Sequence, residues 1–231
     1  METHKDIAVI LVAGGQGSRM GSSLPKQFLQ IGEKPILIYT LEVFRRCMPQ
    51  ALVLIVMHQD YIAHTESLIA SHNLFDKLMI VAGGDTRFHS VQNALAQVPE
   101  TFRLVMVHDA VRPLVTDKML DEGISACKGG RGAIPVVAIK DSLRRLETGQ
   151  SSIPLDRSQI VAVQTPQIFP LDRLKEAYKQ TYQDSFTDDA AVFEKAGFAV
   201  NLYEGDRLNL KITFQEDIDF VNYIFHSGKI M

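Results

Sequence analysis

Apolar and polar positions alternate along the chain in blocks that are typical of an α/β protein. Continuous apolar runs predict buried strands at residues 7–12, 51–57, 78–81, 104–107 and 134–137. The intervening blocks have helical spacing, as where Leu37, Leu41 and Phe44 share one face after Pro35. Strands and helices in this order predict a layered, largely parallel sheet with right-handed crossovers.

The same patterns extend to the end of the chain. Asp85 is a predicted helix cap, followed by the apolar positions Val91, Leu95 and Val98. Further helices are expected near Tyr61, Thr65 and Leu68, at residues 171–182, 188–196 and 216–225, and a further strand at residues 199–203.

The segment from Lys140 to Gln164 departs from this alternation. It carries Arg144-Arg145 and a candidate turn at residues 147–150, with polar alternation on both sides. This predicts an extended hairpin or arm at about residues 139–163. A long segment of this kind in a compact domain serves as a lid or as a dimer contact.

Composition limits the classes of function. With 231 residues, 46% of them hydrophobic, the chain can bury one substantial core, which favours a single domain over residues 1–231. The formal charge of −3 provides no global basic field, so we expect no nucleic-acid partner and only a local anion site.

The cysteine, histidine and hydropathy patterns bear on metal sites and on the cell compartment in which the protein works. Cys47 and Cys127 form no C-x-x-C pair, and the seven histidines lack metal-ligand spacing, so we expect no structural zinc. The N-terminus runs into the first strand without a secretory segment, and no apolar stretch reaches the ~18 residues of a membrane span. We therefore expect a cytoplasmic protein without a membrane partner.

The first strand leads into a glycine-rich loop, Ala13-Gly14-Gly15-Gln16-Gly17-Ser18-Arg19-Met20-Gly21, which is followed by Pro25-Lys26-Gln27. At the carboxyl end of a parallel strand, glycines let backbone N–H groups approach phosphate oxygens, although they also make plain turns. Met20 departs from the dinucleotide fingerprint, and no Gly-Lys-Ser/Thr completes a Walker A loop. Arg19 and Lys26 favour phosphate binding, because their charges can offset a leaving pyrophosphate.

Polar clusters follow the other predicted strands. They are residues 83–90 (GGDTRFHS), 108–113 (HDAVRP), 155–157 (LDR) leading to 164–167 (QTPQ), and 209–213 (NLKIT). Taken singly, each has a simpler explanation: Asp85 as a helix cap, Arg87 and Arg112 as surface charges, Thr165-Pro166 as a turn, and Lys211 as a snorkelling lysine.

Taken together, these clusters resemble those of the 2-C-methyl-D-erythritol 4-phosphate cytidylyltransferases over nearly the whole chain. The shared motifs, in order, are A-G-G-x-G-x-R-M-G with P-K-Q, G-G-D-x-R-x-x-S, H-D-A-x-R-P, D-R, Q-T-P-Q, T-D-D and N-x-K-I-T. The resemblance implies a Rossmann-like, three-layer α/β nucleotidyltransferase fold with a mostly parallel twisted sheet and a protruding β-arm.

The resemblance also implies a reaction. The phosphate of methylerythritol phosphate attacks the α-phosphorus of CTP, with Mg²⁺ or another divalent cation, and pyrophosphate leaves. Direct transfer depends on alignment and charge neutralisation rather than on a covalent intermediate. Arg19 and Lys26 match the residues that hold the triphosphate, and Arg157 and Lys211 match those that position the attacking phosphate.

The remaining carried-over residues form two groups. The nucleotide group consists of Ala13, Gly14, Gly15, Gly84, Asp85, Arg87 and Ser90. The substrate group consists of Asp109, Ser142, Thr165 and Thr187, with Asp109 also facing the magnesium-nucleotide environment. His108 is interpreted as structural, and Ser142 stands where the family commonly has threonine.

The resemblance implies a homodimer in which the arms exchange, so that Ser142 and Arg157 reach the partner's site. Two alternatives stay open. The first is the sister enzyme that acts on ribitol 5-phosphate, disfavoured by Asp156-Arg157 in the arm and by Ala110 after Asp109. The second is a non-catalytic nucleotide-binding module, which has no need for cations that hold a second phosphate.

Overall fold

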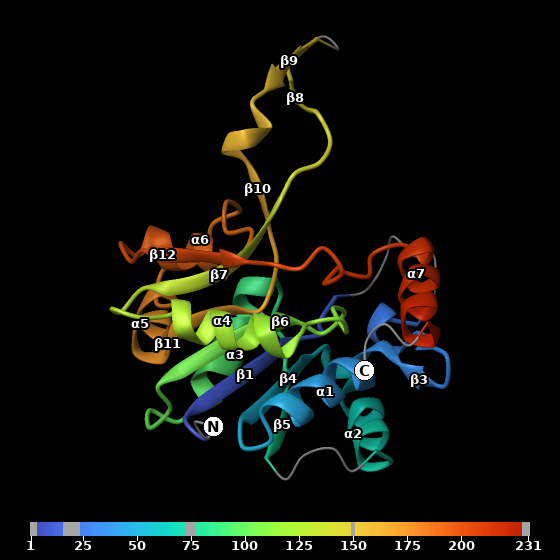
Figure 1. Ribbon diagram of the computed structural model, residues 1–231. Coiled ribbons are helices and arrows are strands. Elements are labelled where there is room, and N and C mark those ends of the chain that lie inside the picture. Colours follow the sequence, from blue (N-terminus) through green and yellow to red (C-terminus); the bar gives the residue numbers. More distant parts are fainter. Residues whose placement is uncertain (1–3, 16–23, 73–76, 149–150, 228–231) are drawn as a thin grey trace.

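A central sheet runs through the molecule, with helices on both faces and a long arm projecting from one side (Figure 1). The computed structural model describes residues 4–15, 24–72, 77–148 and 151–227. Arg19 and the rest of the glycine-rich loop beyond Gly15 therefore lie outside the described residues, as do Gly149 and Gln150 of the candidate turn.

Within the described residues the main sheet has eight strands, in the order β10-β7-β11-β6-β1-β4-β5 with β12 beside β7. Their bounds are β1 Ile7–Val12, β4 Leu52–Met57, β5 Leu78–Ala82, β6 Leu104–Asp109, β7 Gly132–Ala138, β10 Val161–Val163, β11 Gln167–Pro170 and β12 Val200–Glu204. The pairs β1/β4, β1/β6, β4/β5 and β7/β12 are parallel, whereas β10 and β11 pair antiparallel. The mostly parallel sheet and all the predicted strands are confirmed.

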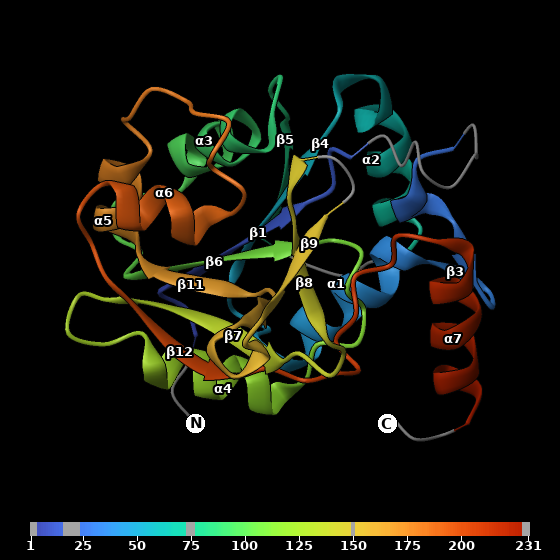
Figure 2. The same cartoon turned by 90° about the horizontal axis from the view of Figure 1, so that it is seen from above.

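The helices of the described part are α1 Ile36–Cys47, α2 Ile62–Ala70, α3 Arg87–Gln97, α4 Asp117–Ala126, α5 Leu171–Ala177, α6 Asp189–Lys195 and α7 Gln215–His226. Short 3₁₀ turns occupy Lys26–Phe28, Gln59–Tyr61 and Arg157–Gln159, and a two-stranded ladder joins β2 (Gln30–Ile31) to β3 (Lys34–Pro35). Seen from above, helices lie on both sides of the sheet, which gives the three layers that were expected (Figure 2).

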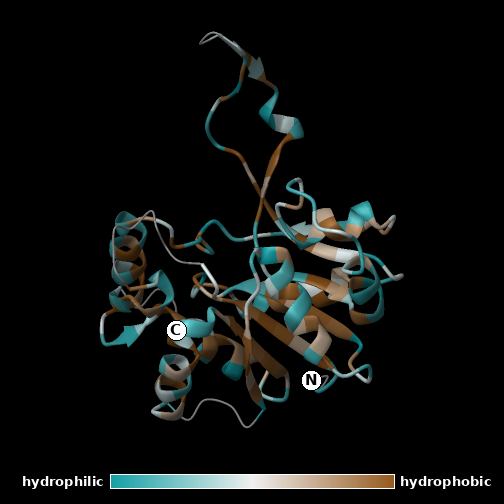
Figure 3. Ribbon diagram, turned by 180° about the vertical axis from the view of Figure 1, so that it is seen from behind, coloured by the Kyte–Doolittle hydropathy of each residue, from teal (hydrophilic) through white to brown (hydrophobic). Residues whose placement is uncertain are grey.

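Alternation within the strands builds the two cores. In β1, Val9 and Leu11 face the α1 and α4 side, and Ala8 and Ile10 face the α3, α5 and α6 side. Both sets are almost fully buried because helices cover both faces. The continuous apolar character of these strands is visible in the brown centre of Figure 3.

Helix α3 begins differently from the prediction. Its N-cap is Thr86, whose Oγ1 accepts from the His89 N–H at 3.3 Å, and not Asp85. Either residue type can cap a helix, and the backbone places the threonine one position later. Asp85 is thereby left exposed at the loop, where it lines the cavity described below.

Helix α4 and strand β11, which help to position the site, were not predicted. A Cβ on Gly123 of α4 would lie 2.6 Å from Ile168 Cδ1, so the glycine lets this helix pack closely on β11. Strand β11 has only four residues and ends at Pro170, a pattern too short to signal a strand. The predicted helix from Leu171 to Tyr182 is also shorter than expected, ending at Ala177.

The predicted arm is present. Strands β8 (Leu143–Leu146) and β9 (Ser152–Leu155) form an antiparallel hairpin that stands away from the body (Figure 1). Its side chains are largely solvent-exposed, with Leu146 83% exposed. In the described part of the chain, no helix is both long and apolar enough to cross a membrane.

Candidate active site

A cavity of about 240 Å³ opens where β1, β5 and β6 end. This is the edge of a parallel sheet at which ligands bind in open α/β folds. All seven residues of the predicted nucleotide group line it, namely Ala13, Gly14, Gly15, Gly84, Asp85, Arg87 and Ser90. Lys26, Asp109 and Lys211 line it too, so the structure brings predicted phosphate-binding cations to the same cavity.

The loop after β1 forms one wall. The Ala13 N–H donates to the Val56 carbonyl at 2.9 Å, which continues the pairing of β1 with β4 beyond the strand. The buried Gln27 donates from Nε2 to the Ala13 carbonyl at 2.5 Å. The Pro25-Lys26-Gln27 motif therefore holds the start of the glycine loop as well as supplying a cation.

The loop after β5 forms the opposite wall. The Gly84 N–H donates to Ser90 Oγ at 3.1 Å, which ties the loop to the first turns of α3. A Cβ on Gly84 would lie 2.5 Å from the His89 Cβ and 3.1 Å from its backbone carbon. Only glycine fits this close approach without displacing the helix backbone.

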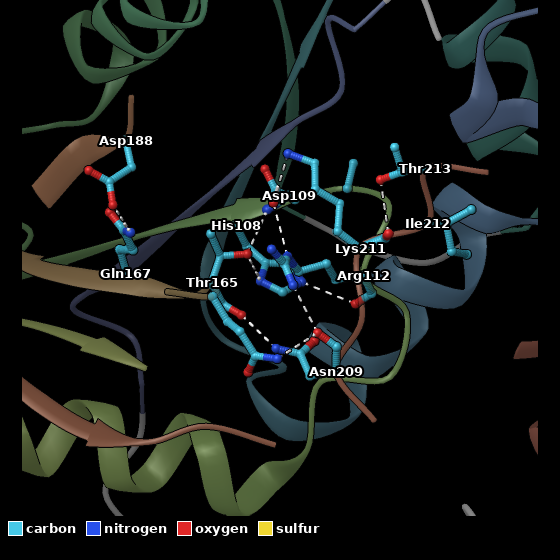
Figure 4. A network of polar contacts seen from close by, with 12 residues as sticks. His108, Asp109, Arg112, Thr165, Gln167, Asp188, Asn209, Lys211, Ile212 and Thr213 are labelled. Carbon is cyan, nitrogen blue, oxygen red and sulfur yellow. Dashed lines mark hydrogen bonds and ion pairs between the residues drawn. The ribbon is translucent and has the colours of Figure 1, made fainter. Parts of the chain in front are cut away.

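The two lysines that line the cavity, Lys26 and Lys211, come from distant parts of the chain. Lys26 Nζ donates to the Ile212 carbonyl at 3.1 Å. Ile212 is buried, and its N–H donates to the Val111 carbonyl at 3.0 Å, which anchors the segment carrying Lys211. Lys211 is thus held over the end of β6 (Figure 4).

Asp109 is the anionic centre of the site (Figure 4). Its Oδ2 lies 2.9 Å from Arg112 Nε and 3.2 Å from Lys211 Nζ. Burial would raise the pKa of this carboxyl group, but the charges of Lys211, Arg87 and Arg112 outweigh it and hold the pKa well below its usual range. Asp109 is therefore a carboxylate at physiological pH. Arg112 is not a surface charge: it is 9% exposed.

A second cavity of about 260 Å³ adjoins the first. It is lined by Arg87, Asp109, Arg112, Val163, Gln164, Thr165, Gln167, Thr187, Asp188 and Lys211. Arg87, Asp109 and Lys211 also line the first cavity. The two cavities therefore meet at one carboxylate and two cations, and the predicted substrate residues Thr165 and Thr187 lie on the side of the second.

Arg87 is engaged within the protein. Its two Nη atoms donate to the carboxylate of Asp189 at 2.9 and 2.6 Å, and Tyr178 also donates to Asp189, at 2.6 Å. The side chain of Asp189 is fully buried. Arg87 therefore supports the wall between the cavities. It is not a solvated surface charge, which was the simpler explanation of this residue.

Two predicted residues lie apart from both cavities. Ser142 and Arg157 belong to the arm and are exposed, and neither lines the cavities described above. Arg157 Nη1 donates to the Lys140 carbonyl. The structure of one chain thus does not bring these two residues to the site.

Sequence reasoning gave no role to several residues that shape the site. Gln167 donates to Asp188 at 2.8 Å and accepts from the Ala190 N–H at 2.9 Å, and so fixes α6 beside the second cavity. Asn209 donates from Nδ2 to the Thr165 carbonyl at 2.8 Å. Both residues stand in motifs that were recognised. The sequence shows only that each is a polar side chain near a strand. Its role could not be predicted, because the groups that it contacts lie far away in the sequence.

The model of the 2-C-methyl-D-erythritol 4-phosphate cytidylyltransferase family matches residues 7–227. This chain belongs to that family. A cytidylyltransferase of this name from Bacteroides thetaiotaomicron is 43% identical over 211 residues, which cover 91% of this chain and 95% of the relative.

Solved structures agree with this membership in the cytidylyltransferase family. The 2-C-methyl-D-erythritol 4-phosphate cytidylyltransferase of Francisella tularensis is 30% identical, with a TM-score of 0.76 over 94% of this chain and 98% of that one. The 4-diphosphocytidyl-2C-methyl-D-erythritol synthase of Anaerococcus prevotii has a TM-score of 0.80 over 95% and 98% of the two chains; at 24% identity it supports the fold alone.

Proposed function

We propose a division of labour between the two cavities in the reaction of this family. As a member of it, the chain is a nucleotidyltransferase that transfers the cytidylyl group of CTP to 2-C-methyl-D-erythritol 4-phosphate, giving 4-diphosphocytidyl-2-C-methyl-D-erythritol and pyrophosphate. CTP occupies the glycine-lined cavity, and methylerythritol phosphate occupies the cavity lined by Thr165 and Thr187.

The observation that carries this proposal is the shared boundary of the cavities at Arg87, Asp109 and Lys211. In direct transfer, the phosphate of the acceptor must approach the α-phosphorus of CTP although both are anionic. The charge of Lys211 at this boundary lowers this repulsion, because a charge that is already in place needs no reorganisation during the reaction.

Lys26 and Arg19 are assigned to the triphosphate. Lys26 enters the nucleotide cavity beside the glycine loop, where its charge can stabilise the pyrophosphate as it leaves. Lys211 is assigned to the phosphate of the acceptor because it lines both cavities. No side chain needs to act as a nucleophile.

A divalent cation, Mg²⁺, is proposed to accompany CTP. Among the described residues, no group of three or more His, Cys, Asp or Glu side chains could hold a metal by itself. Magnesium bound through nucleotide phosphates needs only one or two carboxylates, and Asp85 and Asp109 both line the nucleotide cavity. These two residues therefore fit a magnesium-nucleotide complex, in which the ion neutralises phosphate charge.

We further propose a homodimer that exchanges arms. The arm carries exposed apolar side chains, including Leu146, Ile153 and Val161. Apolar surface on a projecting hairpin favours contact with another chain. In the dimer, Arg157 and Ser142 of one arm would complete the acceptor site of the partner subunit.

Purified chain supplied with CTP, Mg²⁺ and either methylerythritol phosphate or ribitol 5-phosphate tests the activity. We expect pyrophosphate release and a CDP-alcohol only with methylerythritol phosphate, and loss of both with EDTA. A preference for ribitol 5-phosphate would overturn the choice of acceptor. CTP binding without turnover of either acceptor would favour a non-catalytic module.

Mixed dimers test the exchange of arms. Lys211→Ala disables the site in its own chain, and Arg157→Ala disables the arm. Isolated mixed dimers should regain part of the activity, because one of their two sites has both residues intact. Activity no higher than in either parent variant would argue that each site is completed by its own chain.

A compartment that keeps thiols reduced is the proposed location, in keeping with the cytoplasm. Cys47 and Cys127 both carry free thiols. Burial raises the pKa of each thiol to about 12, so neither is a reactive thiolate at neutral pH.

A further inference from the structure

The ring of His108 is buried at the end of β6, beside Asp109. Its exposed fraction is 0%, and its ring makes a T-shaped contact with the ring of Phe44, with 5.2 Å between the centroids. Both ring nitrogens have partners: Nδ1 lies 3.0 Å from Thr165 Oγ1, and Nε2 lies 3.2 Å from the Arg112 carbonyl (Figure 4).

These partners determine where the protons are. A carbonyl oxygen only accepts, so Nε2 carries the hydrogen that is donated to Arg112. The hydrogen-bond partners of this buried ring are a hydroxyl and a carbonyl, neither of which could compensate a buried positive charge, so the ring is neutral and Nδ1 is an acceptor. The Thr165 hydroxyl therefore donates its only hydrogen to His108 Nδ1.

The Thr165 oxygen has a second partner. It accepts from the backbone N–H of Asp109 at 3.1 Å. The hydrogen bonds thus run in one direction, from Asp109 N–H to Thr165, from Thr165 to His108, and from His108 to the Arg112 carbonyl. Aligned hydrogen bonds of this kind strengthen one another in a buried site.

We propose that His108 is a positioning residue which, by taking the hydroxyl hydrogen of Thr165, makes that hydroxyl an acceptor for a hydroxyl group of the sugar-alcohol substrate and fixes Asp109 at the boundary of the cavities. The inference rests on the proposed function, in which Thr165 faces the acceptor. With its hydrogen committed and one lone pair facing Asp109, the hydroxyl has one acceptor position left. A substrate hydroxyl satisfies that position, whereas a phosphate dianion, which has no hydrogen to donate, does not.

Two substitutions at position 108 each preserve one of the two hydrogen bonds made by the His108 ring. In His108→Asn, the amide oxygen can replace Nδ1 as the acceptor for Thr165. In His108→Gln, the amide nitrogen can replace Nε2 as the donor to the Arg112 carbonyl. Each keeps one hydrogen bond and loses the other, so both should lower the melting temperature to a similar extent.

Kinetics distinguish positioning from simple support of the fold. We expect His108→Gln to lower kcat/KM for methylerythritol phosphate about tenfold, with the KM for CTP unchanged, because Thr165 loses its buried acceptor. His108→Asn should stay within about threefold of wild type. His226→Gln, at an exposed histidine of α7, is the matched control.

A second background completes the test. In Thr165→Val, the hydroxyl is gone, so His108→Gln should have no further effect on kcat/KM. A tenfold loss that persists in Thr165→Val, or equal losses in His108→Asn and His108→Gln, would overturn the proposal.

The position of the ring hydrogen can be measured without turnover. Two-bond proton–nitrogen correlation spectra of ¹⁵N-histidine-labelled protein, assigned with His108→Asn, should show the hydrogen on Nε2. A hydrogen on Nδ1 would overturn the inference even if the enzyme is active. Conversely, wild-type protein that leaves methylerythritol phosphate unchanged would contradict the proposed function and leave this spectroscopic result to decide the direction of the hydrogen bonds.

Discussion

Arg87 and Asp189 form a two-pronged ion pair across 102 positions of the sequence, with nitrogen–oxygen distances of 2.9 and 2.6 Å. Arg87 opens α3 beside the glycine-lined cavity, and Asp189 opens α6 beside the cavity lined by Thr165 and Thr187. The pair therefore joins one wall of each cavity, and it explains why an arginine in a motif predicted to bind the nucleotide is directed into the protein.

Asp189→Asn should lower the free energy of unfolding by about 3 kcal/mol, because Arg87 keeps its charge and loses a buried partner. Urea unfolding at neutral pH measures the change. Asp219→Asn, at an exposed position of α7, is the matched control and should change stability by less than about 0.5 kcal/mol. Equal stability of Asp189→Asn and wild type would show that the ion pair contributes nothing.

Tyr178 should make the protein sensitive to alkali. Burial, and then the negative charge of Asp189, raise the pKa of Tyr178 well above its ordinary value of 10.0. The folded-state pKa is raised, so the contribution to stability is complete below about pH 10 and decreases by up to about 1.4 kcal/mol per pH unit above it.

Tyr178→Phe should therefore be less stable than wild type by about 1.5 kcal/mol at about pH 8, where it lacks the hydrogen bond to Asp189. The difference should shrink or reverse at about pH 11. Urea unfolding at both pH values, with the exposed Tyr223→Phe as control, tests this. A difference that does not depend on pH would contradict the burial of an un-ionised phenol.

Gly84 and Gly15 should respond differently to alanine. A Cβ at Gly84 meets the backbone of His89, whereas a Cβ at Gly15 meets nothing within 4 Å. We expect Gly84→Ala to lower the melting temperature by about 5 °C. Gly15→Ala should melt like wild type but raise the KM for CTP, because its methyl group enters the cavity that Gly15 lines. A lowered melting temperature in Gly15→Ala, with wild-type melting in Gly84→Ala, would contradict the steric roles assigned to these two glycines.

Lys26→Ala should lower kcat about a hundredfold, because its charge is assigned to the departing pyrophosphate and is needed most in the transition state. The KM for CTP should change less than kcat does. Lys179→Ala, at an exposed lysine paired with Glu176, should have wild-type kinetics. If Lys26→Ala weakened CTP binding while kcat stayed normal, the transition-state role would have to be abandoned.

Local patterns were sufficient for most of the fold. The apolar runs of β1, β4 and β6 are continuous because both faces of a parallel sheet are covered, and this is a property that the sequence displays directly. Strand β11 was not predicted because its four residues are too few to show a strand pattern, and they form a strand by pairing with β6 and β7. Helix α4 escaped because Gly123, a poor helix former, is required by its close packing on Ile168.

By itself the sequence determined the order of most elements, the family and the chemical character of the predicted strand ends, since these depend on side-chain type and spacing. Tertiary structure alone decided which of these groups act together. Arg112, Lys211 and Thr165 are ordinary polar residues until the sheet brings them to Asp109, where burial and neighbouring charges change their roles. The physical reason is that hydrogen-bond direction and charge compensation depend on distances between segments that local sequence does not encode.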